Sequence, residues 1–535
     1  MRLLSSVGLV GTGLVAMAAG CHLIVGIRDA ELYEVDAGVT PTDCTPEQVQ
    51  ACYGGAEQTE GVGSCKAGTQ TCSTEGAWGP CEGEMLPREE DCSKPEDEDC
   101  NGSVCGETLW VKQFGGDTWI TDVTVDPRNG DIYVAGSFVG PLTIGAVTLD
   151  SGSYAGVALL AKFDKQGTPL WAKQLGKINA SWEDNEGAHA SSVAIDGQGN
   201  VVVVGNASPT INLGFGELPQ GIFIGKFSQS GEPIWGKVCQ SNYADARGVV
   251  DPTTNDVVLV GDFGSSANST IECGSSIFSS DAADIFIARL AANDGVAMTM
   301  DHFGGPGSDQ AADVAIDAHG SIFLIGSAQT GFNFGGGATV AGSFVVKLAS
   351  NSSPVWSKAV GQGSMRSMAL DATGGPALTG SGYSADPLNF GGNDLLQLGD
   401  SYFDLFVAKL DAVGDHGWSK RYESHAVEDV CGSSGADIAI DSKGRMAVIG
   451  WLSRGNVTID NVVLAGDDDS FLVQFDSTGT TAWSKMLGTP REHRLAFSPL
   501  DEIVVAGRLK TPMDFGTGLI TPIGQRDFIL LKIAP

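Results

Sequence analysis

Basic residues are scarce in this chain of 535 residues. Lys and Arg number 31 against 65 Asp and Glu, which gives a formal net charge of -34 at pH 7. So acidic a protein repels nucleic acid and anionic lipid headgroups, and we expect no nucleic-acid partner. Helical periodicity is scarce too, because the apolar segments are short, alternate with polar residues and end at Gly, Asp or Asn. The chain is therefore expected to be all-β.

The motifs of familiar enzymes are missing. No serine stands in a nucleophile elbow, and no Gly-rich stretch has the strand–loop–helix context of a nucleotide-binding loop. Zinc is not supported, because no two histidines have the spacing of a zinc site; they are His22, His189, His302, His319, His416, His425 and His493. We identify no catalytic residue and predict that the protein is not an enzyme.

Long apolar runs are confined to the N-terminus. Met1–Gly20 has one Arg followed by an uncharged apolar stretch, and Cys21 comes next. The end of this stretch, Ala-Ala-Gly-Cys, resembles the bacterial lipobox, which implies a signal peptide at 1–20 and a lipid on Cys21. An uncleaved membrane anchor is the alternative, but the run is short and Gly-rich. Residues 21–43 then form a polar tether, and we expect attachment to the bacterial outer membrane or cell surface.

Cysteines are plentiful, as in proteins of oxidising compartments. Eight of them fall in a predicted disulfide module at 44–106: Cys44, Cys52, Cys65, Cys72, Cys81, Cys92, Cys100 and Cys105. An even number in so short a segment predicts four disulfides, whose connectivity the sequence does not choose. Cys239, Cys273 and Cys431 remain, and an odd remainder predicts one thiol that is free or paired between chains.

A repeat of four short strands fills residues 107–535. One strand ends in Asp, and the next ends in Gly nine or ten residues later. The strand-end residues are Asp126, Asp196, Asp251, Asp317, Asp371 and Asp441, with Ser498 in the last copy. A third strand reads Phe-x-x-Lys in type, and a fourth carries Trp110, Trp171, Trp235, Trp356, Trp418 or Trp483, with Thr299 in a degenerate copy.

Seven copies at steps of 57 to 65 residues predict a seven-bladed β-propeller of four-stranded antiparallel blades. A single blade exposes both of its faces, so we interpret the periodic Trp and Phe as packing between blades. The repeats begin with a Trp strand and end with a third strand. We therefore predict that residues 109–113 pair with 528–533 and close the ring.

The stretches WVKQFGG, AIDGQGNVVVVGN and DLFVAKLDAVG resemble bacterial propeller repeats of the SBBP kind. The resemblance covers about four fifths of the chain. The cysteine module is similar, through EGVGSCKAGTQTCSTEGAWGPCEGE and EDEDCNG, to modules of bacterial surface lipoproteins. These likenesses imply the architecture, a surface location and a metal-binding module, but no activity.

One motif in the module has the form of a calcium loop. Asp97, Asp99 and Asn101 stand at alternate positions before a Gly, and alternate oxygens converge on a hard cation. An EF-hand supplies a Glu at position twelve, where this chain has Thr108, with Glu107 one residue short. Calcium is the cofactor predicted here, and an acidic surface loop is the alternative. Two other acidic groups, 183–186 and 467–469, are interpreted as solvated loops.

Two functions of different classes follow. The first is a membrane-anchored surface lipoprotein whose propeller is a binding scaffold for a protein or polysaccharide, with variable insertions at 138–155, 263–283 and 382–403 as recognition loops. The alternative is an extracytoplasmic hydrolase or lyase with a site at the channel mouth. A cluster of acidic, His or Arg side chains at one mouth favours catalysis, and departures from the repeat confined to outer loops favour recognition.

Overall fold

The computed structural model describes residues 44–535, except 89, 93, 95, 101, 153–155, 177–186, 242–243, 265–268, 336–338, 384–386, 397–402, 427–431 and 489–492. The expected signal peptide, the tether, Cys21, Asn101, Cys431 and the acidic group at 183–186 lie outside the described residues. The chain divides into two compact units. One holds residues up to Cys52 together with Gly68–Glu84, and the other holds Tyr53–Ala67 and Met85–Pro535.

The small unit is a disulfide-linked hairpin. Its strands β1 (Val49–Cys52) and β2 (Gly68–Thr71) pair antiparallel. Disulfides join Cys44 to Cys72 and Cys52 to Cys81. In the large unit, the 3-10 turn η1 (Glu57–Thr59) lies in a segment fixed by the Cys65–Cys100 disulfide, and Cys92 pairs with Cys105. The prediction of four disulfides among these eight cysteines is confirmed.

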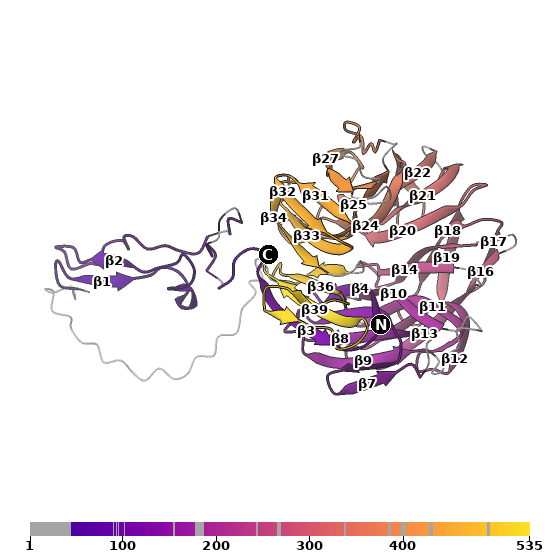
Figure 1. The fold of residues 1–535 in the computed structure, drawn as a ribbon, viewed down its shortest axis with the longest axis horizontal. Coiled ribbons are helices and arrows are strands. Elements are labelled where there is room, and N and C mark those ends of the chain that lie inside the picture. The colour runs from indigo at the N-terminus through magenta and orange to yellow at the C-terminus, as the bar shows by residue number, and fades with distance from the viewer. Residues whose placement is uncertain are drawn as a thin grey trace, which may run out of the picture. The chain divides into compact units, whose positions relative to one another are not determined.

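Within the described residues, seven antiparallel sheets surround a common centre, which confirms the predicted propeller (Figure 1). Their first strands are β4 (Thr118–Val125), β10 (Gly187–Ile195), β14 (Ala244–Val250), β20 (Asp309–Ile316), β24 (Gly363–Leu370), β29 (Ser433–Ile440) and β35 (Arg494–Phe497). The second strands are β5 (Ile132–Phe138), β11 (Val201–Asn212), β15 (Val257–Phe263), β21 (Ile322–Phe332), β25 (Pro376–Tyr383), β30 (Met446–Leu452) and β36 (Ile503–Leu509).

The third and fourth strands complete each blade. The third strands are β8 (Val157–Phe163), β12 (Glu217–Phe227), β18 (Asp284–Leu290), β22 (Val340–Leu348), β26 (Phe403–Leu410), β33 (Asp469–Phe475) and β39 (Asp527–Ile533). The outer strands are β9 (Pro169–Leu175), β13 (Pro233–Ser241), β19 (Ala297–Phe303), β23 (Pro354–Gly361), β27 (His416–Arg421), β34 (Thr481–Gly488) and β3 (Thr108–Phe114). We number the blades 1 to 7 in this order, so that blade 7 holds β35, β36, β39 and β3.

Blade 7 is built from both ends of the described chain. Strand β3 pairs antiparallel with β39, with Val111 opposite Leu531 and Phe114 opposite Phe528. Residues 109–113 therefore lie beside 528–533, the two segments whose pairing the repeat predicts. The Phe114 ring lies 5.2 Å from the ring of Phe528 and 5.3 Å from that of Phe163 in blade 1. Apolar side chains of blades 7 and 1 therefore share one core cluster.

The insertions between second and third strands form small hairpins. They are β6 (Pro141–Ile144) with β7 (Val147–Asp150), β16 (Ser269–Cys273) with β17 (Ser276–Ser280), β31 (Gly455–Ile459) with β32 (Val462–Gly466), and β37 (Met513–Asp514) with β38 (Leu519–Ile520); β28 (Ser424–Ala426) pairs with β31. The β16–β17 hairpin extends the sheet of blade 2 and is fastened there by a Cys239–Cys273 disulfide.

The repeated Asp and Lys pair inside the blade. In blade 2, Asp196 accepts hydrogen bonds from the backbone N–H groups two and four residues on, and its other oxygen lies 2.8 Å from Lys226 Nζ on the third strand. The same pair joins Asp317 to Lys347 and Asp371 to Lys409. Burial acts to raise the pKa of Asp371, but Lys409 and Thr373 hold it at about 2. The strand-end Asp thus shapes the turn and anchors the Lys.

The repeated Trp bridges to the next blade. Trp235 of blade 2 donates its indole N–H to the carbonyl of Ala292, in the turn between the third and fourth strands of blade 3, at 3.1 Å. Lys226 donates to the same carbonyl at 2.8 Å. The turn also holds Gly295 at φ +67°, where an added Cβ meets the Trp235 ring at 2.6 Å. Equivalent glycines face a Trp of the preceding blade at Gly106, Gly167, Gly231, Gly414 and Gly479.

The one repeat without Trp supports this interpretation. Blade 3 has Thr299 on its outer strand, and the corresponding turn of blade 4 carries Ser352 at φ +63° in place of Gly. Arg289 supplies the missing donor, since its guanidinium binds the carbonyl of Ser350 in that turn at 3.0 Å. The glycine is therefore needed where an indole lies against the turn. The interpretation of the periodic Trp as packing between blades is confirmed.

Gly295→Ala tests this contact against a matched control. Gly140 has the same backbone conformation, at φ +70°, with no atom within 4 Å of an added Cβ. We expect Gly140→Ala to lower the free energy of unfolding by about 1–2 kcal/mol through backbone strain. Gly295→Ala should cost about 1–3 kcal/mol more, because the methyl group displaces the indole. Urea denaturation measures both changes in the free energy of unfolding. Equal losses in the two variants would show that the contact between Trp235 and the turn does not stabilise the fold.

Candidate functional site

A ring of polar side chains lines the centre of the propeller. Its members stand four residues before the strand-end Asp or Ser in every first strand, and we call them the axial ring: Asp122, Ser192, Arg247, Asp313, Ser367, Asp437 and Arg494. In β4, β10, β20, β24 and β29 a β-bulge directly precedes this position. A bulge bends the strand and re-aims the side chains beside it, which fits their position along the channel.

The three ring carboxylates each bind the backbone of the following blade. Asp122 accepts the N–H of Val193 at 2.8 Å. Asp313 and Asp437 accept the corresponding N–H groups of Met368 and Leu495, both at 2.9 Å. Each carboxylate also accepts the N–H of its own next residue. These carboxylates therefore link neighbouring blades as well as lining the channel.

The remaining members reach the next blade as well. Ser192 accepts the N–H of Gly248 at 2.8 Å, and Ser367 donates to Asp437 at 2.7 Å. Arg494 donates through Nε to the carbonyl of Thr121 in blade 1 at 2.8 Å. Within the described part of the chain, Arg247 makes only a long ion pair, with Nε 4.0 Å from an Asp313 oxygen. The axial ring is thus a closed circle of contacts around all seven blades.

The ring surrounds a polar cavity of about 360 Å³. Arg247, Arg366 and Arg494 line it together with the three ring carboxylates. Burial raises the pKa of Asp122 to about 7, against the opposing effects of Arg247 and the Val193 N–H, and the charge of Asp437 adds to the rise. Burial also raises the pKa of Asp313. The negative charge of the ring is therefore lowered near neutral pH.

A smaller cavity of about 180 Å³ adjoins the first and shares Arg247 and Asp313 with it. It also contains Asp245 and Asp262, which stand opposite each other on β14 and β15. Burial raises the pKa of Asp262 to about 7, and the charge of Asp245 adds to the rise. Carboxyl groups that titrate near neutral pH are typical of functional sites, although buried structural groups titrate there too.

Sequence reasoning missed these residues. It expected the regular repeats to offer few deviating polar side chains, yet the axial-ring position is polar in every repeat. The signal was present, since counting back four residues from the strand-end Asp finds all seven. It was obscured because Asp, Ser and Arg alternate there with no consensus residue.

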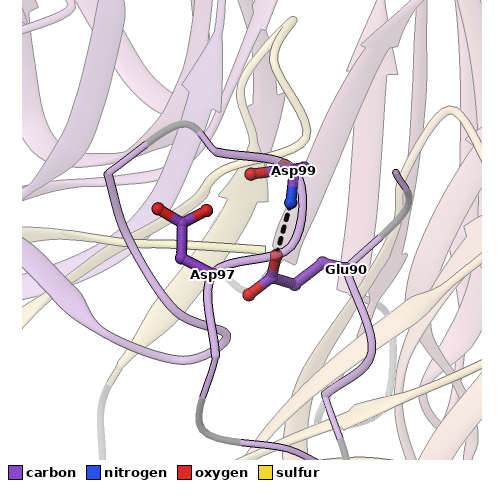
Figure 2. A group of neighbouring side chains, drawn as sticks. All are labelled: Glu90, Asp97 and Asp99. Carbon is purple, nitrogen blue, oxygen red and sulfur yellow. Dashed lines mark hydrogen bonds between the residues drawn. The ribbon is translucent and has the colours of Figure 1, made fainter. Parts of the chain in front are cut away.

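The predicted calcium ligands lie apart from the channel, in the segment fixed by the Cys65–Cys100 disulfide. Asp97 and Asp99 are joined there by Glu90, with one oxygen of each carboxylate within 4.8 Å of the others (Figure 2). Asn101 lies outside the described residues. The loop lacks the ligand that an EF-hand supplies at position twelve. Thr108 stands at this position, begins β3 and donates its hydroxyl to the carbonyl of Phe515.

Glu90 is a further candidate ligand, which the sequence did not identify. Its Oε2 accepts the N–H groups of Glu98 at 2.9 Å and Asp99 at 3.1 Å. Its buried Oε1 has no hydrogen-bond partner among the described residues. Burial raises the pKa of Glu90, and the charges of Asp99 and Asp97 add to the rise. Three hard oxygens with an unsatisfied one among them suit Ca²⁺, so calcium binding stays a prediction here.

The disulfides indicate the cellular compartment in which the protein matures. Five are present among the described residues, and such a number is typical of proteins that mature outside the cytoplasm. Cys239 and Cys273 pair with each other, which leaves Cys431 as the odd cysteine of the repeats. Among the described residues no helix is long and apolar enough to cross a membrane.

The pKa of Asp122 predicts a pH dependence of stability. Its value of about 7 exceeds the 3.9 typical of unfolded chains, so the folded protein binds this proton more tightly. The resulting stabilisation is complete below about pH 4 and is lost as the pH rises through 7. We expect Asp122→Asn to reduce the fall in melting temperature between pH 5 and pH 8. An unchanged fall would show that Asp122 does not titrate in this range.

The calcium prediction is tested by titrating the full-length protein with CaCl₂ in a calorimeter. We expect one site, weakened at least tenfold by Glu90→Gln, because a carboxylate ligand becomes a neutral amide. Asp467→Asn is the control, since Asp467 belongs to another acidic run and its side chain is 74% exposed. No binding heat, or equal binding by both variants, would exclude calcium from the cluster.

No protein-family model and no curated protein sequence matches this chain. Solved structures match the fold. BamB from Moraxella catarrhalis is 11% identical, with 80% of this chain and 99% of that chain covered and a TM-score of 0.35. The polysaccharide lyase Uly1 is 7% identical, covers 80% and 99%, and has a TM-score of 0.42. The Dos1 propeller is 8% identical, covers 80% and 94%, and has a TM-score of 0.39. These likenesses concern the fold alone.

Proposed function

We propose that this protein is an exported lipoprotein, held to a membrane by lipid on Cys21, whose propeller binds a ligand in its axial cavity and partners on its insertion hairpins. The observation that carries the proposal is the axial ring itself. Its side chains surround a polar cavity of about 360 Å³, and contacts to the neighbouring blade hold them in place. A preformed polar cavity binds a ligand without first ordering its own walls.

Binding is favoured over catalysis by the way the ring carboxylates are held. Asp122, Asp313 and Asp437 each accept backbone N–H groups from two blades. The oxygens of Asp122 and Asp313 each accept one of these hydrogen bonds, so a second lone pair on each is open to a ligand. A side chain that also joins two blades is a poor choice for a group that must shift during a reaction.

The insertion hairpins supply a second surface for recognition. Loops on a rigid scaffold commonly carry binding sites, and the β16–β17 hairpin is fastened to blade 2 by the Cys239–Cys273 disulfide. Ile277 on this hairpin is 62% exposed. A partner of the expected kinds, protein or polysaccharide, would meet a surface that is already fixed in shape.

An extracytoplasmic hydrolase or lyase is the alternative, and one observation favours it. Asp122 and Asp262 have pKa values of about 7, which suits a general base at neutral pH. Both carboxyl groups line cavities that share Arg247. The fate of a captured ligand separates the two functions, because a binder returns it unchanged and an enzyme returns it cleaved.

The proposal is tested with full-length protein, solubilised in detergent and immobilised, over which envelope proteins and polysaccharides of the producing cells are passed. We expect a retained compound that elutes with its mass unchanged. Cells fed a labelled fatty acid should label the protein, and Cys21→Ser should abolish the label. Cleavage of the retained compound would establish that the protein is a hydrolase or lyase. A fatty-acid label that persists in Cys21→Ser would show that Cys21 does not carry the lipid.

A further inference from the structure

The three arginines of the axial cavity differ in what they bind. Arg494 donates to the carbonyls of Thr121 and His493, at 2.8 and 3.0 Å. Arg247 has the single long ion pair with Asp313. Arg366 is exposed and has no hydrogen-bond or ion-pair partner among the residues that the structure describes. Its guanidinium group therefore offers up to five unused N–H donors to the cavity.

The place of Arg366 in the fold does not require an arginine. It is the bulged residue of β24, which the ladder to β25 skips between Met365 and Ser367. The bulged positions of blades 1, 2, 4 and 6 carry short side chains: Thr121, Ser191, Ala312 and Ala436. An arginine here departs from the repeat, lines the cavity and joins no blade to another.

We propose that Arg366, assisted by Arg247, is the receptor for an oxyanion in the axial cavity: a sulfate, phosphate or carboxylate group, free or carried on a larger ligand. This proposal rests on the proposed binding function and names the chemistry of its ligand. A guanidinium group presents parallel N–H donors that match two oxygens of such a group. Arg247, which lines the same cavity, adds a second positive charge to the attraction.

The charges of the cavity favour an anion over a cation. Its lining holds three guanidinium groups and three carboxyl groups. The carboxylates already accept backbone N–H groups, whereas among the described residues Arg366 has no hydrogen-bond or ion-pair partner and Arg247 has only the ion pair with Asp313. The raised pKa values of Asp122 and Asp313 further reduce the negative charge of the ring near neutral pH. Arg366 and Arg247 therefore offer hydrogen-bond donors and positive charge to an anion in the cavity.

Calorimetry on the detergent-solubilised full-length protein tests the proposal. The probes are sulfate, phosphate and malonate as free anions, and dextran sulfate as an anionic group on a polymer. We expect at least one probe to bind at one site per chain and Arg366→Gln to weaken it at least tenfold. Arg454→Gln is the matched control, because Arg454 is an exposed arginine outside the cavity that pairs with Asp467. The melting temperature of Arg366→Gln should equal that of the wild type.

Each result bears on the proposal. Loss of only the free-anion binding in Arg366→Gln identifies a small ion as the ligand, and loss of only the polymer binding identifies a polymer-borne group. No binding of any probe, equal binding by Arg366→Gln, or a lower melting temperature of that variant would overturn the proposal. If the envelope ligand is captured equally well by Arg366→Gln, the binding function stands and this site is wrong. If the anions bind at Arg366 and no envelope ligand exists, the binding function is wrong.

Discussion

Contact between one blade and the turn of the next is the constraint on which this propeller depends. Each sheet buries its faces only against its neighbours, so the contact must be repeated at each junction around the ring. An indole ring that lies on a glycine turn meets this need: the glycine lets the backbone come close, and another carbonyl of the turn, as in Gln229 or Ala292, accepts the indole N–H. The junction from blade 3 to blade 4 changes both partners together, with Arg289 binding the turn of Ser350 and Ser352.

The axial ring performs the same task at the inner end of the blades. There polar side chains, and not indoles, join blade to blade. Asp122 joins Val193, Asp437 joins Leu495, and Arg494 joins Thr121. Because these groups are polar, the channel stays polar, and the contacts that close the ring also create a cavity able to hold a ligand. Fold and candidate site thus share one set of residues.

The repeat allowed the fold to be predicted, because Trp, Gly, Asp and Lys recur at fixed places, and the Trp–Gly contact is made at six of the seven blade junctions. The axial ring was not predicted, because an Asp, a Ser or an Arg can each make the contact to the next blade. No single residue type therefore recurs at this position of the repeat. Glu90 escaped for a different reason. It joins Asp97 and Asp99 through the folding of a segment fixed by the Cys65–Cys100 disulfide, and the pairing of eight cysteines could not be read from their spacing.

The variety of the axial ring also bears on its function. An Asp joins the next blade by accepting an N–H group, and Arg494 does so by donating to a carbonyl. Every strand presents both kinds of backbone group, so the blade contact fixes polarity at each position but not the sign of the charge. The contacts between blades therefore do not dictate the order of charges around the channel, and this order can match the charge of a bound ligand. Arg366 also carries positive charge into the same cavity, and it has no hydrogen bond or ion pair to another of the described residues.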